Sequence, residues 1–153
     1  MIKTPQGKRY FLRVLSIASA FDLFQQGYKM SVLSQNDITG KETFSPVRQI
    51  FKSGIKDIYK MRTRRGLFIE CSKEHLFFVN GGYAPLEDMK AGDSITSYVD
   101  NKIVGDKVVS IEFIGRKEEM FDMDVPSVRN LFANGIKCHN SRWFRYLFGS
   151  GAG

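Results

Sequence analysis

Three consecutive residues near the end of this 153-residue chain carry side chains that can react with the backbone: His139, Asn140 and Ser141. The side-chain amide nitrogen of an asparagine can attack the carbonyl of its own residue, which closes a succinimide ring and breaks the next peptide bond. The tether between nucleophile and carbonyl gives this attack a high effective molarity. The departing amine needs a proton, which a neighbouring histidine can supply near neutral pH. Asn140 could thus cleave the Asn140–Ser141 bond with help from His139, and the Ser141 hydroxyl could accept an acyl group.

The tripeptide alone does not decide between this reaction and an ordinary polar turn, so the surrounding sequence matters. Residues 120–141, MFDMDVPSVRNLFANGIKCHNS, resemble the C-terminal signature of inteins, the self-splicing domains of the Hint superfamily. That family has an aromatic-Asp-apolar-x-Val strand, then an Asn-Phe-like and Ala-Asn-Gly strand that ends in His-Asn before Cys, Ser or Thr. The matching residues are Phe121-Asp122-Met123-Asp124-Val125, Asn130-Leu131-Phe132-Ala133-Asn134-Gly135 and His139-Asn140-Ser141.

A second stretch, residues 64–95, resembles another intein motif, Thr-x-x-His followed by a Gly-aromatic pair. Ser72 and His75 occupy the hydroxyl and histidine positions, and the resemblance implies that they polarise the peptide bond at the N-terminal splice junction. It also implies that Asp122 holds the first nucleophile or its proton. Residues 31–54 resemble the hairpin between the motifs, so the resemblance covers roughly residues 2–141.

The sequence departs from the family pattern at two places. Arg129 stands where the family often has His, and arginine cannot act as a base at neutral pH. An intein begins with Cys or Ser, and several residues later comes a characteristic extended stretch. Residues 1–7 of this sequence resemble that later stretch. The resemblance therefore implies the C-terminal fragment of an atypically split intein, with an intein domain at 1–140 that lacks its first strand and nucleophile. Residues 141–153 would be an extein segment and linker.

The reaction expected from this resemblance is protein splicing in trans, in which each molecule turns over once. A short N-terminal intein fragment carrying a leading Cys or Ser would be the partner, and the acyl group would pass to Ser141 before Asn140 cyclises. Two alternatives stay open. One is a Hint-type domain that performs C-terminal cleavage only, and the other is a basic β-domain that binds nucleic acid.

The composition and the cysteine spacing argue against several other classes of function. The net charge is +7, but no motif of a nucleic-acid module accompanies the basic clusters, so we expect no nucleic-acid partner. Cys71 and Cys138 are the two cysteines, and their spacing suits neither a disulfide framework nor a zinc site. We expect no cofactor and no metal, and we expect neither cysteine to be the missing nucleophile. No apolar run approaches the ~20 residues of a membrane span, and a cytoplasmic location is expected.

The candidate site residues must be positioned by short strands. Apolar residues between Tyr10 and Phe24 follow a helical spacing, and Gly27 is a plausible stop. Strand-like segments separated by Gly, Asn or Asp turns follow at 43–51, 57–63, 67–71, 76–79, 94–99, 102–113 and 119–125. We therefore expect an all-β domain, the horseshoe-like Hint fold implied by the resemblance, with one or two short helices.

Overall fold

The computed structural model describes residues 2–6 and 9–139, with side chains described from residue 14 onward. Among them are twelve strands and one α-helix, so the expected all-β class is confirmed. No helix in the described part is long and apolar enough to cross a membrane. The elements are β1 (Ile2–Gln6), β2 (Arg9–Arg13), α1 (Ile17–Gln25), β3 (Ser31–Gln35), β4 (Glu42–Pro46), β5 (Gln49–Thr63), β6 (Phe68–Cys71), β7 (Leu76–Val79), β8 (Gly82–Pro85), the 3-10 turn η1 (Leu86–Asp88), β9 (Ser94–Val99), β10 (Lys102–Asp124), β11 (Asn130–Ala133) and β12 (Ile136–His139).

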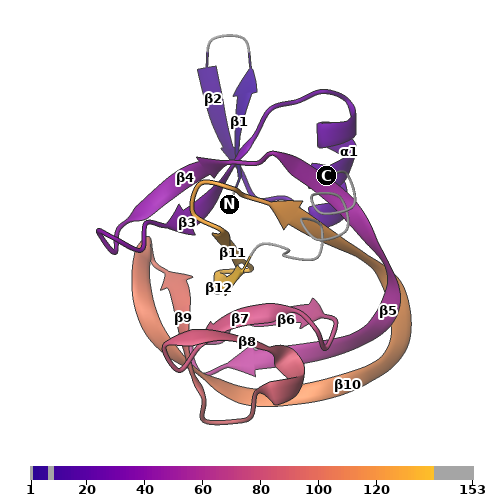
Figure 1. Cartoon of the computed structure of the whole chain (residues 1–153), viewed down its shortest axis with the longest axis vertical. Coiled ribbons are helices and arrows are strands. Elements are labelled where there is room, and N and C mark those ends of the chain that lie inside the picture. The colour runs from indigo at the N-terminus through magenta and orange to yellow at the C-terminus, as the bar shows by residue number, and fades with distance from the viewer. Residues whose placement is uncertain (1, 7–8, 140–153) are drawn as a thin grey trace, which may run out of the picture.

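The strands form two sheets. The smaller sheet has the order β2-β1-β3-β4, and the larger has the order β11-β12-β7-β9-β10-β5-β6, with β8 added beside β7. The long antiparallel pair of β5 and β10 curves around one side and the base of the molecule, and β11 and β12 lie inside that curve (Figure 1). This horseshoe-like arrangement places β12 at the centre of the molecule.

The curvature of the β5–β10 pair comes from interruptions of its register. The pairing shifts between Val108 and Ser110, between Phe113 and Lys117, and between Met120 and Phe121. Gly54 and Gly115 have positive φ angles of 105° and 85°, a conformation that glycine adopts at such irregularities. We expected the sequence to break into separate strands at residues 52–56 and 114–118, and that expectation was wrong. Both strands continue and bend there.

The predicted helix between Tyr10 and Phe24 is only partly correct. Residues 9–13 form β2 and pair with β1, because tertiary pairing outweighs the helical spacing of a few apolar residues. The helix α1 begins after Ser16, whose Oγ caps it by accepting a hydrogen bond from the backbone nitrogen of Ser19 at 3.1 Å. Gly27, with a φ of 93°, follows the C-cap residue Gln26, which confirms the predicted stop.

Two apolar clusters hold the sheets in place. One lies beneath β6, β7, β9 and β12 and includes the fully buried Phe77, Ile136 and Cys138. The other joins α1 to β3, β5 and the end of β10, with Ile50 and Val125 at its centre. Leu131 of β11 packs against both clusters. The β11–β12 hairpin is therefore anchored to both parts of the core.

Candidate active site

The β11–β12 hairpin carries His139 at the end of β12, and its turn is built from Asn134 and Gly135. Their φ angles of 49° and 77° are those of a two-residue turn that matches the twist of the strands. A Cβ on Gly135 would lie 3.0 Å from the carbonyl oxygen of Tyr98, and the Tyr98 nitrogen donates to the Gly135 carbonyl at 2.7 Å. Glycine is thus required both for the turn and for the close approach to β9.

Asn130 fastens the same hairpin to β3. The fully buried carboxamide accepts a hydrogen bond from the backbone nitrogen of Gln35 at 2.9 Å and donates to the Gln35 carbonyl at 2.9 Å. It also donates to the carbonyl of Val128 at 3.2 Å. The side chain thus pairs with Gln35 as a strand backbone would, which gives a structural reason for asparagine at this motif position.

His75 lies in a tight turn before β7. Its backbone nitrogen donates to the Ser72 carbonyl at 3.3 Å, and its own carbonyl accepts from Leu86 at 2.9 Å. Part of the residue remains accessible, but Nε2 is buried and has no hydrogen-bond partner among the described residues. Burial, with a smaller contribution from the charge of Lys56, lowers the pKa of His75 to about 4. The imidazole is therefore neutral at pH 7, and a buried unpaired nitrogen of this kind is typical of a functional site.

Asp122 lies on β10 opposite Phe51 of β5 and is partly buried. Burial raises the pKa of its carboxyl, while the charge of Lys56 and a hydrogen bond from the Ser53 hydroxyl act in the opposite direction. A carboxyl group with a raised pKa can take up and release a proton closer to neutral pH than an exposed one. Asp122 is therefore suited to moving a proton.

The described residues bring these groups into one region. Lys56 on β5 acts electrostatically on both His75 and Asp122. Burial, with a smaller contribution from the charge of Asp122, raises the pKa of Cys138, which pairs with Phe77 across β12 and β7. The ring of His75 meets that of Phe77 edge-on at 4.8 Å between centroids. Strands β5, β7, β10 and β12 thus meet around the candidate residues.

His139 ends β12 and faces the opposite side of that strand from Cys138. Its ring meets the ring of Tyr83 on β8 edge-on, with centroids 4.6 Å apart and an interplanar angle of 80°. Burial, followed by the charges of Asp37 and Cys138, raises the pKa of Tyr83 to about 12. The aromatic contact fixes the plane of the imidazole immediately before the predicted cleavage position.

The remaining sequence candidates are placed as follows. Ser72 is buried, and its carbonyl closes the turn that holds His75. Asn140 and Ser141 lie outside the described residues. Arg129 is exposed and has a φ of 60°, and its backbone nitrogen donates to the Val125 carbonyl at 2.9 Å. Lys56 and Ser53 were not identified as site residues, because both lie on β5, far in the chain from the motifs that carry the candidates.

Both cysteines are poor nucleophiles in this fold. Cys71 and Cys138 are buried within β6 and β12. Burial raises the pKa of Cys71, helped by Cys138, and burial raises the pKa of Cys138 to about 12. Because the thiolate is the reactive form, both groups are inert at neutral pH.

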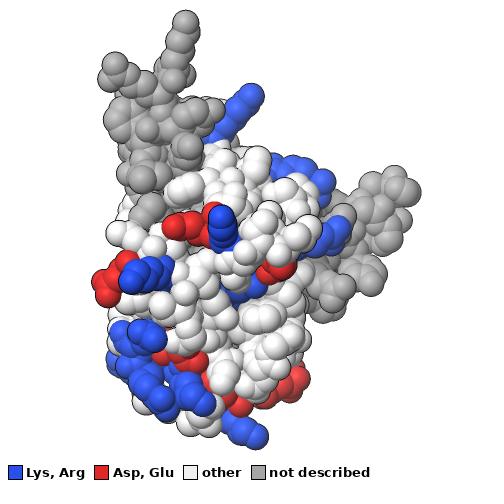
Figure 2. Space-filling model, turned by 90° about the vertical axis from the view of Figure 1, so that its left-hand side faces the viewer, with Lys and Arg blue, Asp and Glu red and all other residues white. Residues whose placement is uncertain are grey.

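The basic surface is mixed in sign. Lys and Arg side chains gather over the lower part of the face in Figure 2, with acidic side chains among them. On the long strand β10, Arg116 forms ion pairs with Glu118 at 2.8 Å and with Glu70 at 2.6 Å. The expected absence of a nucleic-acid partner stays a prediction.

No family model matches this chain, and no curated protein does. Solved structures do. The DnaB intein from Synechocystis sp. PCC 6803 is 29% identical over 84% of this chain and 88% of that chain, with a TM-score of 0.75. A variant of the Ssp DnaB mini-intein is 31% identical over 74% of this chain and 77% of that chain, with a TM-score of 0.68. The VidaL intein, at 15% identity, matches over 92% of this chain and 90% of that chain with a TM-score of 0.77, which shows the fold alone.

These matches confirm the Hint fold expected from the motifs. The identity to the mini-intein variant extends over more than two thirds of both chains. This chain therefore belongs to the inteins, the family of autocatalytic protein-splicing domains.

Proposed function

We propose that this chain is the catalytic body of an intein that splices in trans. The first nucleophile, Cys or Ser, would be supplied by a short N-terminal fragment on a separate polypeptide. The proposal is supported by the presence of His75, Asp122 and His139 among the described residues of this chain, so that the partner would supply the nucleophile and a strand. Cys71 and Cys138 cannot take that part, because both thiols are buried in strand interiors.

The observation that carries the proposal is the buried Nε2 of His75, which has no hydrogen-bond partner within residues 2–6 and 9–139, beside the Lys56 that also acts on Asp122. In the first step the partner's nucleophile attacks the carbonyl before it, the C–N bond breaks, and an ester or thioester forms. A neutral imidazole can polarise that carbonyl by donating a hydrogen bond, and the Ser72 hydroxyl would assist. Asp122 would accept the proton of the nucleophile and pass it to the departing amine nitrogen as the C–N bond breaks.

The later steps follow the order of the C-terminal residues. The Ser141 hydroxyl attacks the ester and takes over the acyl group, and the first nucleophile regains its proton. The amide nitrogen of Asn140 then attacks its own carbonyl, the bond to Ser141 breaks, and His139 delivers a proton to the departing amine. That amine attacks the adjacent ester, and an amide joins the two exteins.

A reconstitution experiment tests the proposal. The full chain is mixed with a synthetic peptide that carries a reporter sequence, a leading Cys and a short strand-forming segment, and the products are weighed by mass spectrometry. We expect a product in which the reporter is joined to residues 141–153. A peptide with Ala in place of the leading Cys is the matched control and should give no ligated product.

The outcomes separate the alternatives. Release of residues 141–153 without any ligated product would favour a domain that performs C-terminal cleavage only. If neither ligation nor release occurred, the assignment of a splicing function to this chain would be wrong.

A further inference from the structure

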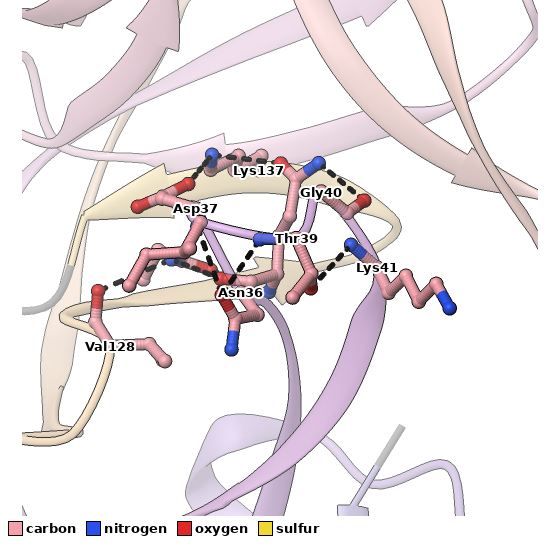
Figure 3. A network of polar contacts seen from close by, with 10 residues as sticks. Asn36, Asp37, Thr39, Gly40, Lys41, Val128 and Lys137 are labelled. Atoms are coloured by element: carbon pink, nitrogen blue, oxygen red, sulfur yellow. Dashed lines mark hydrogen bonds and ion pairs between the residues drawn. The ribbon is translucent and has the colours of Figure 1, made fainter.

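The face of β12 that carries His139 also carries a buried lysine, Lys137. Its side chain is 2% exposed, although an ammonium group is costly to remove from water unless it is paired. Its Nζ donates to Asp37 Oδ1 at 2.8 Å and to Gln35 Oε1 at 2.8 Å. Figure 3 shows Lys137 reaching toward Asp37 in the turn between β3 and β4. A single side chain therefore ties the last strand to a turn one hundred residues away in sequence.

An aromatic pair continues the contact from Lys137 toward His139. The Nζ of Lys137 lies 4.2 Å from the centroid of the Phe78 ring, within the range of a cation–π interaction. Phe78 pairs across the β7–β8 hairpin with Tyr83, and the rings meet edge-on at 5.3 Å and 68°. Tyr83 in turn meets His139 edge-on at 4.6 Å. We name these three supporting residues, Lys137, Phe78 and Tyr83, the β12 brace.

The β12 brace can orient the His139 side chain in two ways. Lys137 and His139 are two residues apart, so they share a face of β12, and holding one side chain orients the strand that carries the other. Tyr83 contacts the imidazole directly. A T-shaped contact fixes the plane of a ring without taking its proton. This is the constraint that a histidine needs if it is to deliver a proton to one particular bond.

We propose that Tyr83 and Lys137 are positioning residues for His139, and that they set the rate at which the Asn140–Ser141 bond is cleaved. This inference rests on the proposed function. Neither residue touches the reacting atoms in this account. Each acts through the orientation of the imidazole.

Substitutions of Tyr83 in the full chain test the direct contact between Tyr83 and His139. Each variant is mixed with the synthetic N-terminal peptide, and the release of residues 141–153 is timed by mass spectrometry. Tyr83→Leu removes the aromatic contact, and we expect release to slow by about tenfold or more, since small misplacements of a catalytic group have effects of that size. Tyr83→Phe keeps the ring and should retain most of the rate. Tyr28→Leu is the matched control, because Tyr28 is a comparably exposed tyrosine beyond α1 (46% against 39%) and should leave release unchanged.

Lys137→Met tests the orientation of His139 through the shared face of β12 and is expected to fold. Asp37, the partner left behind, is 57% exposed and can be hydrated, so the substitution strands no buried charge. We expect the release of residues 141–153 to slow several-fold. On a logarithmic scale this is roughly half the effect of Tyr83→Leu, because the contact between Tyr83 and His139 remains.

A structural measurement accompanies the rates. The measurement uses an Asn140→Ala background, which cannot release its tail. There the NMR signals of the His139 ring protons should shift when Tyr83→Leu or Lys137→Met is added. Urea midpoints report whether each variant is folded. If a folded Lys137→Met or Tyr83→Leu variant released the tail at the parent rate with unchanged His139 signals, the inference would be overturned. Release of the tail by Asn140→Ala itself would instead contradict the proposed function.

Discussion

His75 has the most perturbed environment of the candidate residues, and this makes it a sensitive point for pH. Folding lowers the pKa of His75 from 6.5 to about 4. As the pH falls below 6.5 the unfolded chain takes up this proton first, so protonation favours unfolding. The stability contributed by neutral His75 is therefore present above pH 6.5 and is lost as the pH falls toward 4.

We accordingly predict that the free energy of unfolding decreases between pH 6.5 and pH 4 by up to about 3 kcal/mol through His75 alone. Urea denaturation at several pH values measures this slope, and His75→Gln is the control that should flatten it. Because the pKa of Asp122 is raised, its carboxyl changes the free energy of unfolding with pH in the opposite direction. This contribution is the same in the parent and in His75→Gln. Equal slopes in the parent and the variant would show that burial does not lower the pKa of this imidazole.

At the residue scale, the sequence offered candidates only among side chains that belong to motifs. Ser72, His75, Asp122 and His139 were named from the resemblance to intein motifs; all four are among the described residues, and their roles stay predictions. Lys137 was not identified, because its partner Asp37 is 100 residues away in the chain. Its type alone predicts an exposed side chain, so no local pattern could have shown its burial.

At the scale of elements, the β11–β12 hairpin is the part whose geometry is most restricted. The Asn-Gly turn was readable from the sequence, because two adjacent residues with positive φ favour this pair. The close approach of Gly135 to β9 was not readable, since it depends on the neighbouring strand. The bends of β5 and β10 were misread as breaks for a similar reason. A local glycine signals irregularity without saying whether the strand continues beyond it.

The hairpin gives a prediction with a built-in control. Gly135→Ala should lower the free energy of unfolding by about 2–4 kcal/mol, because it adds a clash with the Tyr98 carbonyl to the strain of a positive φ. Gly81→Ala has a similar φ of 85° but no atom within 4 Å of the added Cβ, so it should cost only about 1 kcal/mol. Urea denaturation of both variants separates the two effects, and equal losses would show that the contact with β9 does not matter.

At the scale of the whole molecule, the paired strands β5 and β10 curve around one side and the base, and the strand that ends in His139 lies inside that curve (Figure 1). The all-β class and the intein family could be predicted, because the motifs occupy fixed places in this topology. The strand order could not be predicted from the residues alone, since it depends on pairings between segments far apart in sequence. His75, Asp122 and His139 all belong to the described part of this one chain, on or beside strands of the larger sheet.

The measurement that tests this account most directly is the mass of the domain released in the earliest minutes of the reaction. Cyclisation of Asn140 leaves a fragment ending in a succinimide, which is lighter by one water than the fragment that simple hydrolysis would give. We predict the lighter species first, its slow conversion to the heavier one, and neither in Asn140→Ala. Release of the heavier fragment from the first time point, or release by Asn140→Ala, would contradict the claim that this intein cleaves itself through Asn140.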